Sequence, residues 1–241
     1  MRIPRIYKNG ELITGQTIEL DLNASRHVCK VLRLDNGADL LLFNGKGKSA
    51  RAILKSTSAK AVQVEIISEI SEKTESPLQI HLGLGISKGD RMDYAIQKAV
   101  EVGVHSITPL RTEHTVVRLD QKRTEKKLNH WQGIILSACE QCGRATLPTL
   151  NSVLTLDKWL THNSPCKIVF DTESEQTLSQ LDKVEMVSVL IGPEGGLSAK
   201  EISQANTNDF HSIKLGPRIL RTETAVVSGC SALQTIWGDY C

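Results

Sequence analysis

From residue 78 onward, apolar runs alternate with amphipathic segments, and this rhythm restricts the fold more than any other feature. Five apolar runs are typical of buried strands: residues 78–84, 104–110, 167–170, 186–191 and 212–215. Helical periodicity is found between or after them, at residues 88–102, 120–144 and 156–160 and beyond 191 and 215. Strands that alternate with helices form parallel sheets covered by helices. The sequence therefore predicts an α/β domain over residues 78–241.

The first 70 residues have a different pattern, dominated by short strands. The candidate strands are residues 2–7, 17–22, 38–43, 48–54 and 61–68. One helix interrupts them, with Asn23 as its expected N-cap and with Val28 and Val31 on its apolar side. Many short strands with a single helix indicate a small β-barrel over residues 1–70. Residues 71–77 are polar and are expected to form a linker.

Positive charge is concentrated in this N-terminal region. Its 70 residues carry 11 Lys and Arg against 7 Asp and Glu, although the whole chain has a net charge of only +2. A local basic excess favours a polyanionic partner such as nucleic acid, because phosphates exchange their counterions for basic side chains. A solvated lysine-rich surface is the alternative.

Several classes of protein are not indicated by the sequence. No apolar run approaches the roughly 18 residues of a membrane span, and the start of the chain lacks the pattern of a signal peptide. The seven histidines show no grouping typical of a metal site. We therefore expect a cytoplasmic protein with no membrane association and no metal.

The strongest motif is a glycine-rich turn at residues 192–197, directly after the predicted strand at 186–191. Ser198 and Glu201 are spaced as a capping box that opens a helix after the turn. Ligands of parallel α/β sheets bind outside the carboxyl ends of the strands, where this turn is placed. Its spacing matches neither the phosphate loop nor the dinucleotide fingerprint. A strand-to-helix connection without a ligand is the alternative.

A second turn, at residues 216–217, follows the strand at 212–215 and leads into a helix with Thr222 as its expected N-cap. Two arginines stand in this otherwise apolar loop. If the loop is partly buried, Arg221 needs an anionic or carbonyl partner, because an unpaired buried charge is costly. The alternative is a surface arginine paired with Glu223.

The end of the long predicted helix carries four polar residues, Ser137, Glu140, Gln141 and Arg144. Their helical spacing predicts one shared polar face. Such a face can hydrogen-bond the edge of a nucleobase or accept a proton. A solvated helix end whose side chains pair with one another is the alternative.

Seven stretches, taken in order, carry a family resemblance: RIPRIY at 2–7, HVCKVLRL at 27–34, SKGDRMDYAIQKAVEVGV at 87–104, ITPL at 107–110, ACEQCGR at 138–144, LIGPEGGLSAKEI at 190–202 and LGPRILRTETA at 215–225. Together they resemble the RsmE family of 16S ribosomal RNA uridine N3-methyltransferases. The resemblance implies a PUA-like β-barrel at residues 1–70. It also implies a SPOUT-type α/β domain at 78–241 whose chain forms a deep trefoil knot.

The resemblance further implies S-adenosylmethionine as the methyl donor, bound among the two turns. The positions that match donor-binding residues are Leu190, Gly192, Glu194, Gly195, Gly196, Leu215, Gly216, Leu220, Arg221 and Thr222. Residues 170–174 fall where a third cofactor-contacting stretch is expected, but they depart from the family pattern and receive no individual roles. Methyl transfer from a sulfonium needs two groups held in line and no metal.

The acceptor, a uracil N3, carries a proton that must leave. We expect Arg221 to stabilise the uracil oxygens and Glu140 or Glu194 to receive the proton. The expected RNA contacts are Arg2, Arg5, Arg26, Lys30, Arg33, Lys88, Arg91, Gln141 and Arg144.

The partners implied by the resemblance are 16S ribosomal RNA, within the small ribosomal subunit, and a second copy in a homodimer. Two alternatives stay open at this point. One is a SPOUT RNA methyltransferase with a different target, and the other is a non-catalytic RNA-binding factor in ribosome assembly.

Overall fold

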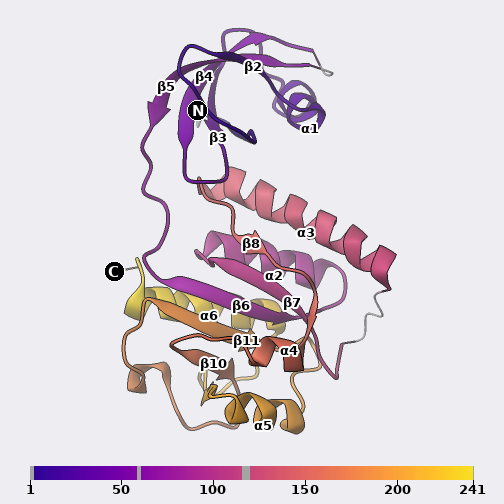
Figure 1. Ribbon diagram of the computed structural model, residues 1–241, viewed down its shortest axis with the longest axis vertical. Coiled ribbons are helices and arrows are strands. Elements are labelled where there is room, and N and C mark those ends of the chain that lie inside the picture. The colour runs from indigo at the N-terminus through magenta and orange to yellow at the C-terminus, as the bar shows by residue number, and fades with distance from the viewer. Residues whose placement is uncertain (1–2, 59–60, 116–119, 241) are drawn as a thin grey trace. The chain divides into compact units, whose positions relative to one another are not determined.

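The computed structural model describes residues 3–58, 61–115 and 120–240 (Figure 1). The chain divides into two compact units. The first consists of Met1–Glu75 and Cys139–Leu147, and the second of Ser76–Ala138 and Pro148–Cys241. The stretch Cys139–Leu147, which begins with the last residues of a long helix, thus groups with the N-terminal strands.

The first unit contains a curled sheet of five short strands. They are β1 (Arg5–Tyr7), β2 (Thr17–Glu19), β3 (Asp39–Phe43), β4 (Ser49–Ser56) and β5 (Gln63–Ile70), in the order β1-β3-β4-β5-β2. Only β1 and β3 pair in parallel, and the other neighbours are antiparallel. Register shifts between β4 and β5 mark bulges, which bend a sheet toward closure. The concave core is aliphatic and includes Ile6, Leu40, Leu42 and Val64.

The helical segment of this unit differs from the prediction. Helix α1 (Leu22–Arg26) has Asp21 as its N-cap and not Asn23, because the Asp21 carboxylate stands one position before the helix and accepts the N–H groups of Asn23 and Ala24 at 2.8 and 2.9 Å. The next residues, His27–Val31, form a π-helical turn, η1. The wider turn changes the direction in which the side chains of this segment point. As a result, Val31 is 66% exposed and not buried as predicted.

The second unit is built on an all-parallel sheet. Its strands are β6 (Gln79–Gly85), β7 (Ser106–Arg111), β8 (Thr149–Leu150), β9 (Leu154–Thr155), β10 (Lys167–Phe170), β11 (Met186–Ile191) and β12 (His211–Ile213). The order is β12-β10-β11-β6-β7-β8, and β9 also pairs with β7. The predicted parallel α/β domain is confirmed.

Helices cover both faces of this sheet. The covering helices are α2 (Asp90–Glu101), α4 (Leu156–Leu160), α5 (Ala199–Thr207) and α6 (Thr222–Trp237). The chain also forms the long helix α3 (Gln121–Cys142) and a short 3-10 turn, η2, at Leu178–Gln180. Successive strand residues point to opposite faces. Val169 packs with residues of α4 and α5, whereas the next residue, Phe170, places its ring against Gly229 of α6. The pairs α4–α5 and α2–α6 therefore lie on opposite faces.

The polar face predicted for the end of α3 does not form. The helix ends at Cys142, and Gly143 follows with a φ of 95°, which turns the chain out of the helix. Arg144 therefore lies beyond α3, where it is 6% exposed and its Nη2 is 2.6 Å from Oε2 of Glu75. Gln141 remains exposed at the helix surface.

Within the described ranges, none of the helices combines the length and apolarity needed to cross a bilayer. Nor do the described His, Cys, Asp and Glu side chains gather in any group arranged to hold a metal ion.

Two half-buried histidines are hydrogen-bonded to serines of the parallel sheet. Nδ1 of His81 is 2.7 Å from Oγ of Ser106, and Nε2 of His162 is 2.6 Å from Oγ of Ser188. Burial, followed by the nearby imidazole of His105, lowers the pKa of His81. Burial is also the main cause that lowers the pKa of His162. Folding therefore favours the neutral form of both imidazoles.

These two histidines predict a loss of stability on mild acidification. An unfolded histidine titrates near pH 6.5, so below about that pH the unfolded chain binds protons before the folded chain does. Their contribution is complete above pH ~6.5 and falls as the pH drops toward the lower folded-state pKa values. We expect the melting temperature to fall between pH 7 and pH 5. A melting temperature that stays constant over this range in differential scanning calorimetry would contradict the prediction.

Candidate active site

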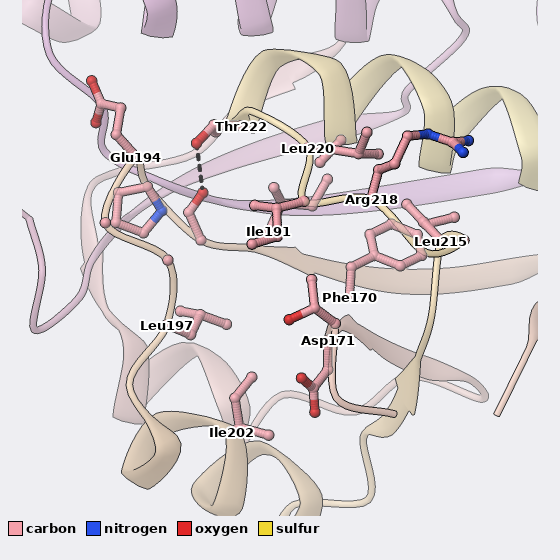
Figure 2. A pocket seen from close by; sticks show the side chains of 18 residues that line it. Phe170, Asp171, Ile191, Glu194, Leu197, Ile202, Leu215, Arg218, Leu220 and Thr222 are labelled. Carbon is pink, nitrogen blue, oxygen red and sulfur yellow. Dashed lines mark hydrogen bonds between the residues drawn. The ribbon is translucent and has the colours of Figure 1, made fainter. Parts of the chain in front are cut away.

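A cavity of about 320 Å³ opens at the carboxyl ends of β10 and β11 (Figure 2). This volume lies at the lower end of the roughly 300–1,000 Å³ of ligand sites. The wall is made by residues 170–172 at the end of β10, 191–197 at the end of β11, and 215–216, 218–220 and 222 after β12, together with Ile202 and Ala225. It occupies the edge at which parallel α/β sheets bind their ligands.

The first glycine turn is braced by the helix that follows it. Oγ of Ser198 accepts the N–H of Glu201 at 3.2 Å, and Oε2 of Glu201 accepts the N–H of Ser198 at 2.9 Å. The predicted capping box is confirmed. It fixes the start of α5 and therefore the path of the turn between Ile191 and Ser198.

The two turns are joined by Thr222. The N-cap of α6 is Arg221, whose side chain makes no capping bond, so the prediction of Thr222 as N-cap was wrong by one position. Thr222 is the first helical residue, and its hydroxyl donates to the carbonyl of Gly192 at 3.1 Å, as the dashed line in Figure 2 shows. This bond ties the second turn to the first across one end of the cavity.

Glu194 belongs to the cavity wall, and its carboxylate holds the loop in place. Its Oε1 accepts the N–H of Lys88 at 2.9 Å and lies 3.7 Å from Nη1 of Arg91. Burial alone would raise the pKa of Glu194, but hydrogen bonds from Lys88, its own N–H and Ser87, with the charge of Arg91, lower it overall. Figure 2 shows the carboxylate pointing away from Ile202 at the far side of the cavity.

The cavity wall combines aliphatic surface with polar groups. Its side chains include Ile191, Leu197, Ile202, Leu215 and Leu220, and the carboxyl group of Asp171 stands among them (Figure 2). A Cβ atom built on Gly196 or Gly216 meets no protein atom within 4 Å. The backbone there is open to a ligand. Such a wall suits a ligand with a flat apolar ring and several polar substituents.

The structure brings together eight of the ten predicted donor-binding residues in this wall: Gly192, Glu194, Gly195, Gly196, Leu215, Gly216, Leu220 and Thr222. Leu190 is fully buried and packs in the core beneath the sheet edge. Arg221 is exposed and is not part of the wall.

Sequence reasoning missed other wall residues, namely Ile191, Pro193, Leu197, Ile202, Arg218, Ile219 and Ala225. The segment at 170–174, for which it assigned no roles, contributes its first three residues.

Glu140 belongs to the first unit, in the last turn of α3. Its Oε1 accepts the backbone N–H of Tyr7 at 3.1 Å. Burial is the largest influence on its carboxyl group and raises the pKa of Glu140 above the ordinary value.

Two of the predicted RNA contacts are engaged inside the first unit. Arg5 is 7% exposed, and its Nη1 lies 2.7 Å from Oε1 of Glu72. Arg144 is likewise buried and paired with Glu75. Buried, paired guanidinium groups are not free to bind phosphate, so both arginines are removed from the set of surface contacts. Arg2 lies outside the described residues.

Comparisons with known proteins define the class. Residues 74–234 match the RNA methyltransferase domain family, and residues 20–67 match the RNA methyltransferase PUA domain family. The chain is therefore an RNA methyltransferase with a PUA-like N-terminal domain and a SPOUT-type α/β domain.

Relatives along the full length identify the family. The chain is 39% identical to ribosomal RNA small subunit methyltransferase E of Buchnera aphidicola subsp. Schizaphis graminum over 99% of this chain and 98% of that protein. It is 31% identical to the protein of the same name from Bacillus subtilis over 92% of this chain and 88% of the relative. The chain belongs to the ribosomal RNA small subunit methyltransferase E family.

Two solved structures are similar throughout. A putative methyltransferase from Legionella pneumophila, in complex with the cofactor S-adenosylmethionine, superposes with a TM-score of 0.97 at 41% identity, covering 99% of this chain and all of the other. Ribosomal RNA small subunit methyltransferase E from Neisseria gonorrhoeae, bound to S-adenosylmethionine, gives 0.94 at 37% identity with full coverage of both chains.

Proposed function

We propose that this protein transfers the methyl group of S-adenosylmethionine to N3 of one uridine in 16S ribosomal RNA, at the decoding site of the small subunit. The observation that carries the proposal is the cavity between two glycine turns at the carboxyl ends of the strands. It occurs in a chain that matches donor-bound relatives over its whole length.

The cavity wall fits the donor. Aliphatic side chains such as Leu197 and Leu215 suit the faces of an adenine ring, while Asp171 and the open backbone at Gly196 and Gly216 suit its polar groups. The donor supplies a sulfonium methyl group that an in-line nucleophile displaces. The protein's task is then to hold donor and acceptor in near-attack geometry.

The acceptor nitrogen must lose its proton, and the two candidate carboxylates differ in basicity. Each carboxylate accepts one backbone N–H, that of Lys88 at Glu194 and that of Tyr7 at Glu140, but the pKa of Glu194 is lowered whereas burial raises the pKa of Glu140. A stronger base accepts a proton more readily. We therefore propose that Glu140 accepts the proton of uracil N3 and that Glu194 holds its loop in place. We propose that Arg221 stabilises the uracil oxygens.

The two carboxylate roles have different kinetic consequences. Glu140→Gln should lower turnover at saturating donor without changing donor affinity. Glu194→Gln should weaken donor binding, because the bond to Lys88 is weakened. Calorimetry for affinity and single-turnover kinetics for methyl transfer separate these effects. The reverse pattern would exchange the two assignments.

We propose that exposed basic residues bind the RNA backbone: Arg26, Lys30 and Arg33 in the first unit, and Lys88 and Arg91 beside the donor loop. Arg26 ends α1, Lys30 lies in the π-helical turn η1, and Arg33 follows that turn two residues later. Arg33 is held at a φ of 51°, a conformation that side chains other than glycine rarely adopt and that often marks a functional position. Gln141, exposed at the end of α3, remains a candidate contact to a base edge.

Removing this charge should weaken RNA binding and its dependence on salt. Each lost phosphate contact lowers the slope of log affinity against log salt by roughly 0.7–0.9. The triple change Arg26→Ala, Lys30→Ala, Arg33→Ala is therefore expected to reduce the slope by about two to three. Filter binding at several salt concentrations measures it.

The control for this triple variant is Arg51→Ala with Lys55→Ala. These two side chains are paired with Asp39 and Glu65 on the same unit. The control should leave the slope nearly unchanged. Equal slopes for the wild type and the triple variant would rule out this surface as the RNA contact.

The family resemblance supports three further proposals: a homodimer, a deep trefoil knot within residues 78–241, and a cytoplasmic location. We also propose residues 1–70 as the RNA-binding domain, joined by the linker 71–77 to the catalytic domain. Sedimentation velocity tests the dimer directly. A species with the 26.5 kDa mass of one chain would contradict it.

The proposed activity is tested with methyl-labelled S-adenosylmethionine and two acceptors, naked 16S RNA and small subunits that lack the modification. Transfer to the subunits, with little to naked RNA, is the expected result. A non-catalytic assembly factor would bind the subunits and transfer no label, and this outcome would reject the proposal.

A further inference from the structure

His114 contacts the first glycine turn from a different part of the chain. It follows β7, 81 residues before Gly195, and its Nδ1 lies 2.9 Å from the carbonyl oxygen of Gly195 and 3.3 Å from that of Gly196. Carbonyl oxygens only accept hydrogen bonds, so Nδ1 must carry the proton. A Cβ atom on Gly195 would stand 2.8 Å from Cβ of His114. The two segments are therefore in direct contact at the rim of the cavity.

The segment that carries His114 is itself fixed. The N–H of Thr112 donates to Oγ1 of Thr115 at 2.9 Å, which closes a tight turn. The N–H of Glu113 donates to Oε1 of Glu201 at 2.8 Å. Glu201 is 6% exposed and also closes the capping box of α5. His114 is thus anchored on both sides, so its hydrogen bond can impose an orientation on the glycine turn.

The orientation of the glycine turn determines where the N–H group of Leu197 points. In a trans peptide the C=O and the N–H point in opposite directions. Because His114 holds the carbonyl of Gly196, the N–H of Leu197 in the same peptide group points away from His114. Leu197 lines the cavity. Across the part of the chain that the structure describes, its N–H has no protein acceptor.

We propose that His114 is a positioning residue of the methyl-donor site. Its Nδ1–H donates to the carbonyls of Gly195 and Gly196. It thereby directs the N–H of Leu197 toward a hydrogen-bond acceptor atom of S-adenosylmethionine. This inference rests on the proposed function, because it requires that the cavity binds S-adenosylmethionine. His114 acts only through the backbone of the turn and takes no part in the transfer itself.

The test compares three substitutions at this position by calorimetry with S-adenosylmethionine. His114→Ala removes the hydrogen bond and should weaken donor binding roughly three- to tenfold. His114→Asn places an amide N–H near the position of Nδ1 and should restore affinity to within about twofold of the wild type. His114→Gln places its amide near the position of Nε2 and should behave like His114→Ala.

Kinetics and a control variant distinguish positioning from general damage. Turnover at saturating donor should be unchanged in His114→Ala, with the effect confined to the KM for the donor. His211→Ala, at an exposed histidine on β12, should bind the donor normally.

Wild-type affinity in His114→Ala, or equal loss in His114→Asn and His114→Ala, would overturn this inference alone. A wild-type protein that does not bind the donor would instead reject the proposed function, and this inference would fall with it.

Discussion

Replacing Arg221 with alanine is expected to lower the turnover number by roughly 10²–10³-fold, the usual cost of removing one group that stabilises a developing anion. Donor affinity should stay within about twofold of the wild type, because Arg221 is not part of the cavity wall. The side chain is exposed at the start of α6, one residue before Thr222, which is tied to Gly192. Single-turnover methyl transfer and calorimetry measure the two quantities separately.

A matched arginine and a conservative variant sharpen this prediction. Arg123 is an exposed arginine at the start of α3, with 71% of its side chain accessible, so Arg123→Ala should retain full turnover. Arg221→Lys keeps the charge but loses the planar pair of donors, so its turnover should lie between those of wild type and Arg221→Ala. If Arg221→Ala transferred methyl groups at the wild-type rate, the assignment of Arg221 to the uracil would be wrong.

Substituting alanine for Gly85 should abolish detectable donor binding, a loss of more than about 100-fold. Gly85 is the last residue of β6 and lies directly behind the first glycine turn. A Cβ atom there would stand 2.4 Å from the backbone nitrogen of Pro193 and 2.8 Å from the carbonyl carbon of Gly192. Both neighbours are backbone atoms and cannot rotate away. The turn must therefore move as a whole, and the cavity wall moves with it.

Gly133→Ala is the control for this substitution. Gly133 lies in α3 and a Cβ atom there meets nothing within 4 Å, so alanine should raise helix stability slightly and leave donor affinity unchanged. Circular dichroism and thermal melting show whether Gly85→Ala still folds. A folded Gly85→Ala protein that binds the donor with wild-type affinity would show that the turn does not form the donor site.

Local sequence patterns predicted much of the fold because the strands of a parallel sheet are buried on both faces. The bounds of β10, β11 and α4 agree with the prediction, and the capping box of Ser198 and Glu201 forms as expected. The failures arose where two local choices compete. Asp21 and Asn23 are both good N-caps, and only Asp21 lies at the right distance from free N–H groups. The π-helical turn that exposes Val31 has no pattern of its own.

The candidate site was predictable where glycines and strand ends coincide, and not where distant segments meet. Nothing near Glu194 in the sequence shows that Lys88, 106 residues earlier, holds its carboxylate. Likewise, the spacing that placed Arg144 on a helix face could not show its burial against Glu75. The contribution of Ile202 to the wall depends on how α5 docks on the sheet, which periodicity does not contain.

We propose that this protein methylates N3 of one uridine in small-subunit ribosomal RNA. The most direct measurement is mass spectrometry of nucleosides and RNA fragments after incubating purified protein and S-adenosylmethionine with unmodified small subunits. We expect 3-methyluridine at one position and no other new modification. A methyl group on a ribose oxygen, on another base, or on no nucleoside at all would contradict it.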